Sequence, residues 1–272
     1  MAVAGNSEKR VYGSVNGTIH EWEFISPRHA ASAELETSVT SLSKQLEGWE
    51  WMLPLDIKMN EENLEHHIQK GTGGAFVALH LGYHHYATLL YFRFLEPAAS
   101  SSPLADIYRT RCDFHASSYS NLLKLARHKR NCEVIHPTVG HMAVVSSSVL
   151  VHTLLCGEER ALQSAREALN ANFAAILELR RYWPNTAPMV HRLVTFQNFC
   201  LLSNDYRTHR LDGWMIRFLI EYSLPLGEKD VETVTSGMDV DMDGFSTRTQ
   251  VLTDQGRYTS FAIDGYHSPE GM

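Results

Sequence analysis

The chain has 272 residues, of which 44% are hydrophobic and 20% charged, and its formal net charge is −7 at pH 7. This balance is typical of a globular protein and excludes a wholly disordered, collagen-like or polybasic chain. The acidic charge is uneven, because residues 228–272 hold nine acidic and three basic side chains, whereas residues 1–227 are nearly neutral. Without a basic field, direct sequence-tolerant binding of nucleic acid by this chain is not expected.

Residues 1–30 are rich in Gly, Ser and Asn and show no period, which predicts a flexible N-terminal segment. Residues 31–227 then contain apolar residues at the 3–4 spacing of amphipathic helices. The expected helices lie at about 35–53, 76–94, 104–126, 137–155, 162–183, 190–202 and 214–222. Pro54, Pro97 and Pro184 follow three of them, and a polar link containing Gly71 separates the first two.

Strand-like alternation is nearly absent before residue 228. The predicted fold class is therefore all-α, a bundle of about seven packed helices that forms one domain over 31–227. Residues 228–272 are expected to be an acidic, disordered tail, with a weak hairpin at 250–262 as an alternative for part of it.

Nothing in the sequence indicates secretion or membrane insertion. The first ten residues lack a continuous apolar core, and the apolar stretch 142–155 is too short and too polar to span a bilayer. The four cysteines lie 20 to 44 residues apart with no Cys-x-x-Cys pair, which argues against a zinc knuckle and favours free thiols in a reducing compartment.

Histidine is the residue type that suggests metal chemistry, because the chain has 15 of them. His80 and His84 are spaced i, i+4 on one expected helix and could face a shared ion, so a helical metal-dependent enzyme is an alternative. The pair lacks the intervening Glu of His-Glu-x-x-His. The competing interpretation is that these rings lie at the edge of a helix packing face and form hydrogen bonds with backbone groups or neighbouring helices.

The acidic tail combines carboxylates with large apolar side chains. The pattern consists of Asp239, Asp241, Met242, Asp243 and Phe245. Such a composition is typical of a disordered activation segment, and a merely solubilising tail is the alternative.

Five short motifs in a fixed order resemble one known family. They are Leu42-x3-Leu46-x2-Trp49-x3-Leu53-Pro54, then Leu79-His80-Leu81-x-Tyr83-His84-x-Tyr86-Ala87-x-Leu89-Leu90, Cys112 with Ala116, Leu122 and Leu123, Pro137 with Gly140, and Tyr182-Trp183-Pro184. Residues 35–225 are thereby similar to the fungal-specific transcription factor domain, the middle homology region of fungal zinc-cluster transcription factors. The family's second motif normally ends in His-Arg-Pro-Phe-Leu, whereas this chain has Phe92-Arg93-Phe94-Leu95 without the proline.

The resemblance implies a non-catalytic regulatory domain that acts in RNA polymerase II transcription and is controlled by a ligand or partner. It implies a nuclear protein, with shuttling to the cytoplasm as the alternative, whose partners are the transcription machinery or other regulators. In the family, DNA is contacted through a six-cysteine zinc cluster, which these 272 residues lack and whose place would be upstream of Met1. The chain is therefore expected to be a C-terminal portion of a longer factor, a shortened gene product, or a relative that has lost direct DNA binding. Zinc is expected only if such an upstream cluster exists, and no cofactor is expected within this chain.

Crevices between packed helices can hold a small apolar ligand or a partner helix. The candidate lining residues are Tyr83, Tyr86, Trp183, Phe196 and Trp214. Ordinary core packing is the alternative role for these aromatic side chains, and a plain homodimerisation scaffold is the alternative for the whole domain.

Overall fold

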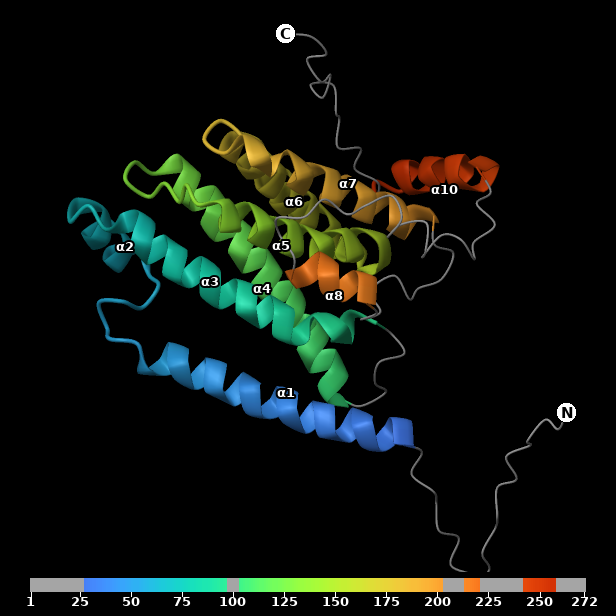
Figure 1. The fold of residues 1–272 in the computed structure, drawn as a ribbon, viewed down its shortest axis with the longest axis horizontal. Coiled ribbons are helices and arrows are strands. Elements are labelled where there is room, and N and C mark those ends of the chain that lie inside the picture. Colours follow the sequence, from blue (N-terminus) through green and yellow to red (C-terminus); the bar gives the residue numbers. More distant parts are fainter. Residues whose placement is uncertain (1–26, 97–102, 203–212, 221–241, 258–272) are drawn as a thin grey trace, which may run out of the picture. The chain divides into compact units, whose positions relative to one another are not determined.

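The structure is a computed structural model that describes residues 27–96, 103–202, 213–220 and 242–257. Every regular element within these residues is a helix, which confirms the all-α prediction (Figure 1). The α-helices are α1 (Pro27–Met52), α2 (Glu61–Gln69), α3 (Gly73–Tyr91), α4 (Pro103–His128), α5 (Pro137–Cys156), α6 (Glu159–Leu179), α7 (Ala187–Leu202), α8 (Gly213–Ile220) and α10 (Met242–Asp254). Two short 3-10 helices, η1 (Phe92–Leu95) and η2 (Pro184–Thr186), follow α3 and precede α7.

The chain divides into two compact units, Met1–Ser38 and Val39–Met272. Helix α1 begins in the first unit and ends in the second, so residues 39–52 are the part of α1 that belongs to the larger unit.

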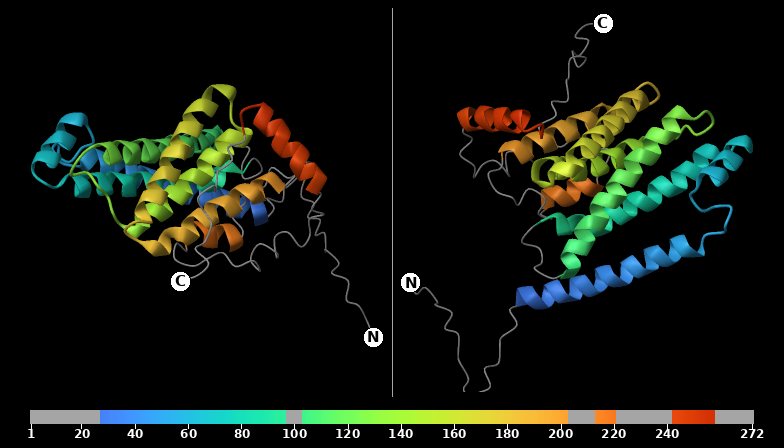
Figure 2. Two further views of the ribbon diagram at one scale, coloured as in Figure 1. Left: turned by 90° about the horizontal axis from the view of Figure 1, so that it is seen from above. Right: turned by 180° about the vertical axis from the view of Figure 1, so that it is seen from behind.

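Helices α3, α4, α5 and α6 form the centre of the larger unit. Helix α4 packs against α3, α5 and α6, and α5 also packs against α7, as the views in Figures 1 and 2 show. The central helix α5 is buried along most of its length, with Val144, Val145 and Val149 fully enclosed. Burying large apolar side chains contributes about 1.5–3 kcal/mol each, so this packing dominates the stability of the bundle.

Helix α5 is also the one helix among the described residues that is long and apolar enough to cross a membrane. Most of the helix is enclosed by its neighbours, which is how the core helix of a globular bundle is expected to look. Its start is well defined, because Pro137 occupies the first turn and His136 Nδ1 accepts a hydrogen bond from the Thr138 amide.

The serines of α5 are buried yet satisfied. Ser147 Oγ donates to the Ala143 carbonyl at 2.7 Å, one turn back, as helical serines commonly do. Asn172 of α6 adds a link between helices, because its amide nitrogen lies 3.2 Å from Ser146 Oγ and 3.1 Å from Ser147 Oγ. A small polar network therefore joins α5 and α6 inside an otherwise apolar core.

Helix α2 lies where the sequence analysis expected only a polar link. Asn60 caps it, since Asn60 Oδ1 accepts a hydrogen bond from the Asn63 amide at 2.8 Å. Glu61 and Glu62 in the first turn also favour the helix dipole. Gly71, with φ of 74°, adopts the left-handed conformation that ends the helix. The sequence contains these capping signals. Leu64 is the one buried residue of α2, however, and a single apolar position gives no helical periodicity from which to predict a helix.

Residues 228–272 were expected to be a disordered tail, with a hairpin at 250–262 as the alternative, whereas the structure has helix α10 at Met242–Asp254, which corrects both expectations for these residues. Arg257 explains why the helix is held in place, since its Nη1 donates to the carbonyls of Leu154 and Gly157, each at 3.1 Å. Gly256, with φ of 66°, follows α10 and lets the chain turn toward these acceptors.

Candidate functional site

The 39–52 part of α1 is attached to α3 and α4 by a row of polar contacts that run through three tyrosine hydroxyls. These contacts are Thr40 Oγ1 with Tyr108 OH at 2.8 Å, Ser43 Oγ with Tyr91 OH at 2.8 Å, and Tyr83 OH donating to Glu50 Oε2 at 2.8 Å. Arg111 of α4 also pairs with Glu47. Residue numbers rise along α1 as they fall along α3, so the two helices run antiparallel. We call this row the tyrosine ladder.

Beside the tyrosine ladder lies an apolar groove of about 590 Å³. Its walls are Leu42, Gln45, Leu46 and Trp49 from α1 and Tyr86, Leu89 and Leu90 from α3. The volume of the groove is within the range of small-molecule sites. A groove between two neighbouring helices can also hold an amphipathic helix of a partner. We call it the α1–α3 groove.

The groove has unusually exposed apolar walls. Tyr86 is 64% exposed and Leu42 is 50% exposed, although both sit beside other apolar side chains. Single exposed hydrophobic residues are ordinary, whereas a contiguous group of them marks an interaction surface. The α1–α3 groove is therefore the candidate functional site.

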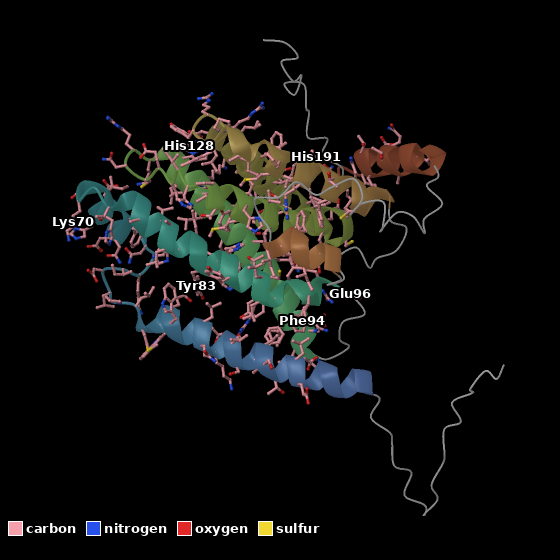
Figure 3. All side chains as sticks on the ribbon, viewed as in Figure 1. Lys70, Tyr83, Phe94, Glu96, His128 and His191 are labelled. Atoms are coloured by element: carbon pink, nitrogen blue, oxygen red, sulfur yellow. The ribbon has the colours of Figure 1, made fainter. Side chains whose placement is uncertain are left out.

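Tyr83 connects the tyrosine ladder to the groove, because its hydroxyl belongs to the ladder and its ring contacts a groove residue. Its ring stacks on Trp49 at 5.4 Å between centroids, and Figure 3 shows the side chain pointing from α3 toward α1. Burial raises the pKa of the Tyr83 hydroxyl, and the hydrogen bond to Glu50 raises it further, so the phenol stays protonated and acts as a donor. This residue positions the groove wall but is itself buried.

The predicted lining residues do not form one site. Of the five, Tyr86 lies in the groove, whereas Tyr83 is buried and stacks on the groove residue Trp49. Trp183 follows α6 and does not line the groove; its Nε1 donates to the Ile135 carbonyl at 3.2 Å. Phe196 is fully buried in α7 and stacks on Phe218 of α8 at 4.9 Å. Trp214 is in α8, but its side chain is outside the described part of the chain.

The candidate activation segment is only partly covered by the structure. Asp239 and Asp241 lie outside the described residues. Met242, Asp243 and Phe245 are in the first turn of α10, and their side chains are not described either.

The two histidines of the metal hypothesis do not share a target. His80 Nε2 donates to the Ile57 carbonyl at 2.9 Å, whereas His84 Nδ1 faces His115 Nδ1 of α4 at 3.0 Å. Within the ranges that the structure describes, no three His, Cys, Asp or Glu side chains are arranged to hold a metal ion. The geometry thus matches the competing interpretation, in which these rings bind backbone and neighbouring helices.

The central histidines form two pairs that start from consecutive residues of α3. His84 pairs with His115, and His85 lies 6.0 Å from His141 of α5 between ring centroids. Burial lowers the pKa of His84 to about 3 and the pKa values of His85, His115 and His141 to about 4. These rings are therefore neutral at pH 7 and belong to the core rather than to a charged site.

Sequence reasoning assigned Leu42, Leu46, Trp49 and Leu90 to apolar helix stripes, which are ordinarily core. The structure shows that these residues wall an open groove instead. Periodicity identifies the apolar face of a helix but not how much of that face a neighbour covers. One signal was available, because the apolar residues of α1 are interrupted by Ser43, Glu47 and Glu50, which face the tyrosine ladder.

Comparison with known proteins adds no relative: no family model, no curated protein and no solved structure matches this chain.

Proposed function

We propose that this chain is a regulatory, non-catalytic domain that acts in transcription control by docking a protein partner in the α1–α3 groove. The proposal places the protein in the nucleus, with any DNA contact made by a separate module. The single observation that carries it is the groove itself, an open apolar surface with Tyr86 at its rim.

The origin of the groove walls supports this assignment. Leu42, Leu46 and Trp49 belong to the first motif of the resemblance to fungal zinc-cluster regulators, and Tyr86, Leu89 and Leu90 belong to the second. In the fold these two motifs meet at one surface. Residues that served only as core would not need to leave Tyr86 and Leu42 at least half exposed.

A reporter assay tests the proposal. The chain is fused to an unrelated DNA-binding module, and reporter expression is compared with that of the module alone. We expect the fusion to change expression and Leu42→Glu to abolish the change, because a carboxylate in the groove would have to be desolvated by the docked partner. Leu42 is half exposed, so the substitution should leave the fold intact, which thermal unfolding checks.

The matched control is Leu177→Glu on α6, where the leucine is exposed but lies outside the groove. This variant should act like the wild type. A fusion that leaves the reporter unchanged, or a Leu42→Glu variant as active as the wild type, would refute the proposal. A thermal-shift screen with apolar compounds separates the alternative occupant, since a small ligand raises the melting temperature of the wild type but not of Leu42→Glu.

A further inference from the structure

Helix α3 presents an exposed face that carries no charge. None of its 19 residues is Asp, Glu, Lys or Arg. The exposed positions are Ala75, Ala78, Leu79 and Tyr86, with Gly82 and Leu89 partly exposed. A surface helix normally places charged residues opposite its buried stripe. Tyr86 and Leu89 belong both to this face and to the groove, and the groove walls are uncharged as well, so the face of α3 and the groove adjoin as one neutral surface.

Gly82, at the centre of this face, has no role in the internal packing of the described chain. A Cβ at Gly82 would meet no described atom within 4 Å, whereas a Cβ at Gly73 would lie 2.5 Å from the Asn131 carbonyl oxygen. Glycine inside a helix costs about 1 kcal/mol relative to alanine. The residue costs stability without serving the described fold, and its effect is to let another backbone approach α3 closely.

The face is complementary to itself about a two-fold axis through Gly82. Gly82 is the middle residue of α3 (Gly73–Tyr91). When two copies of α3 meet antiparallel at that residue, positions equally far before and after it face one another. Tyr86 of one copy then lies opposite Ala78 of the other, and Leu89 lies opposite Ala75. Each large side chain meets a small one, and both pairs occur twice, as in an isologous interface.

We propose that the partner seated on the α3 face and its adjoining groove is a second copy of this chain, related by a two-fold axis at Gly82. The neutral surface favours a second copy, because a face that meets itself brings like charges together and this face has none. Stable homodimer interfaces are likewise more apolar than transient ones. The inference rests on the proposed function for its role in regulation, while the dimer itself is a physical claim.

Mass in solution tests the dimer. Light scattering across a concentration series should give a dimer for the wild type and a monomer for Tyr86→Glu, with Leu177→Glu on α6 remaining dimeric. Gly82→Leu should also give a monomer and yet unfold at a higher temperature than Tyr86→Glu, because leucine is a better helix former than glycine. A wild-type monomer throughout the series, or a Tyr86→Glu dimer, would overturn the inference.

Cysteine cross-linking tests the register. In a Cys156→Ser background, which removes the exposed native thiol, Ala78→Cys and Tyr86→Cys variants are mixed and mildly oxidised. The mixture should form a disulfide-linked dimer and each variant alone should not, because position 78 faces position 86 of the other copy. Self-cross-linking of either variant to the same extent as the mixture would contradict the two-fold axis at Gly82.

The two proposals can fail separately. A dimer in the predicted register whose Leu42→Glu variant still acts on the reporter refutes the proposed function and leaves the dimer standing. A monomeric wild type refutes the dimer and leaves the reporter assay to decide the function.

Discussion

His84 of α3 and His115 of α4 face one another with their Nδ1 atoms 3.0 Å apart. At this distance one ring donates a proton and the other accepts it, so both Nδ1 atoms cannot be protonated while the contact persists. Burial lowers the pKa of both rings. Charge on His115 or His80 would further oppose protonation of His84, and the positive charge of Arg111 opposes protonation of His115. The helix contact therefore requires at least one of the two rings to be neutral.

Acid should destabilise the protein below about pH 6.5. Histidines whose pKa is lowered to about 4 or less in the folded state bind protons first in the unfolded chain, so the free energy of unfolding falls from pH 6.5 down to about pH 4. Asp113 opposes this trend in part, because burial raises its pKa to about 6 and protonation then favours the folded state. Urea unfolding at several pH values measures the net slope.

In the variant His115→Phe the free energy of unfolding should fall less steeply as the pH is lowered. The substitution removes one titrating ring and keeps an aromatic side chain near Tyr91. His191→Gln, at an exposed position of α7, should leave the slope unchanged. Equal slopes for the wild type and His115→Phe would show that the buried pair does not control acid stability.

Tyr91→Phe should loosen the 39–52 part of α1. The substitution removes the hydroxyl that bonds Ser43 Oγ, and one such hydrogen bond contributes about 1 kcal/mol. Amide hydrogen exchange should therefore accelerate at residues 39–52 much more than in α5. The control is Tyr119→Phe, which removes the bond from Tyr119 OH to the Val139 carbonyl in the core and should lower protection throughout the bundle. A uniform change for both variants would contradict a locally attached α1.

Asn172→Ala should lower the free energy of unfolding by about 1–3 kcal/mol, because it removes the donor that joins Ser146 and Ser147 and leaves a space in the core. Asn172→Leu should cost less. It fills the space and removes the Asn172 Oδ1 atom, which has no hydrogen-bond partner among the described atoms, while Ser146 and Ser147 keep their carbonyl acceptors. Denaturant unfolding gives the comparison, and an Asn172→Leu variant as unstable as Asn172→Ala would rule out this account.

Gly74→Ala should destabilise the start of α3 by about 1–3 kcal/mol, because the added Cβ would lie 2.8 Å from the Glu133 carbonyl oxygen, a backbone atom that cannot easily move. Gly48→Ala on α1 is the matched control: a Cβ there meets no described atom within 4 Å, and the variant should gain about 0.5–1 kcal/mol from helix propensity. Thermal unfolding distinguishes the two signs. The same sign for both substitutions would contradict the packing at Gly74.

Several features could be predicted without the structure because they depend on neighbours along the chain. The 3–4 spacing of apolar residues predicted a helix at about 162–183, and α6 buries Leu162, Ala165, Leu169 and Ile176. Within α5, Ser147 bonds the carbonyl one turn back, as buried serines in a helix commonly do. These are short-range properties, set by helix periodicity and by hydrogen bonds within one turn.

The sequence by itself determined the all-α class, the main helices and the uneven charge, because each depends on local pattern and composition. Only the tertiary structure decided that Tyr86 stands at an open groove while Phe196 is buried, and that His84 meets His115 rather than His80. Helical stripes specify which side chains avoid water, but the packing of one helix on another decides which of them remain uncovered. At α1, hydrogen bonds to Tyr83, Tyr91 and Tyr108 hold the helix in place and leave its neighbouring apolar residues free to form the groove.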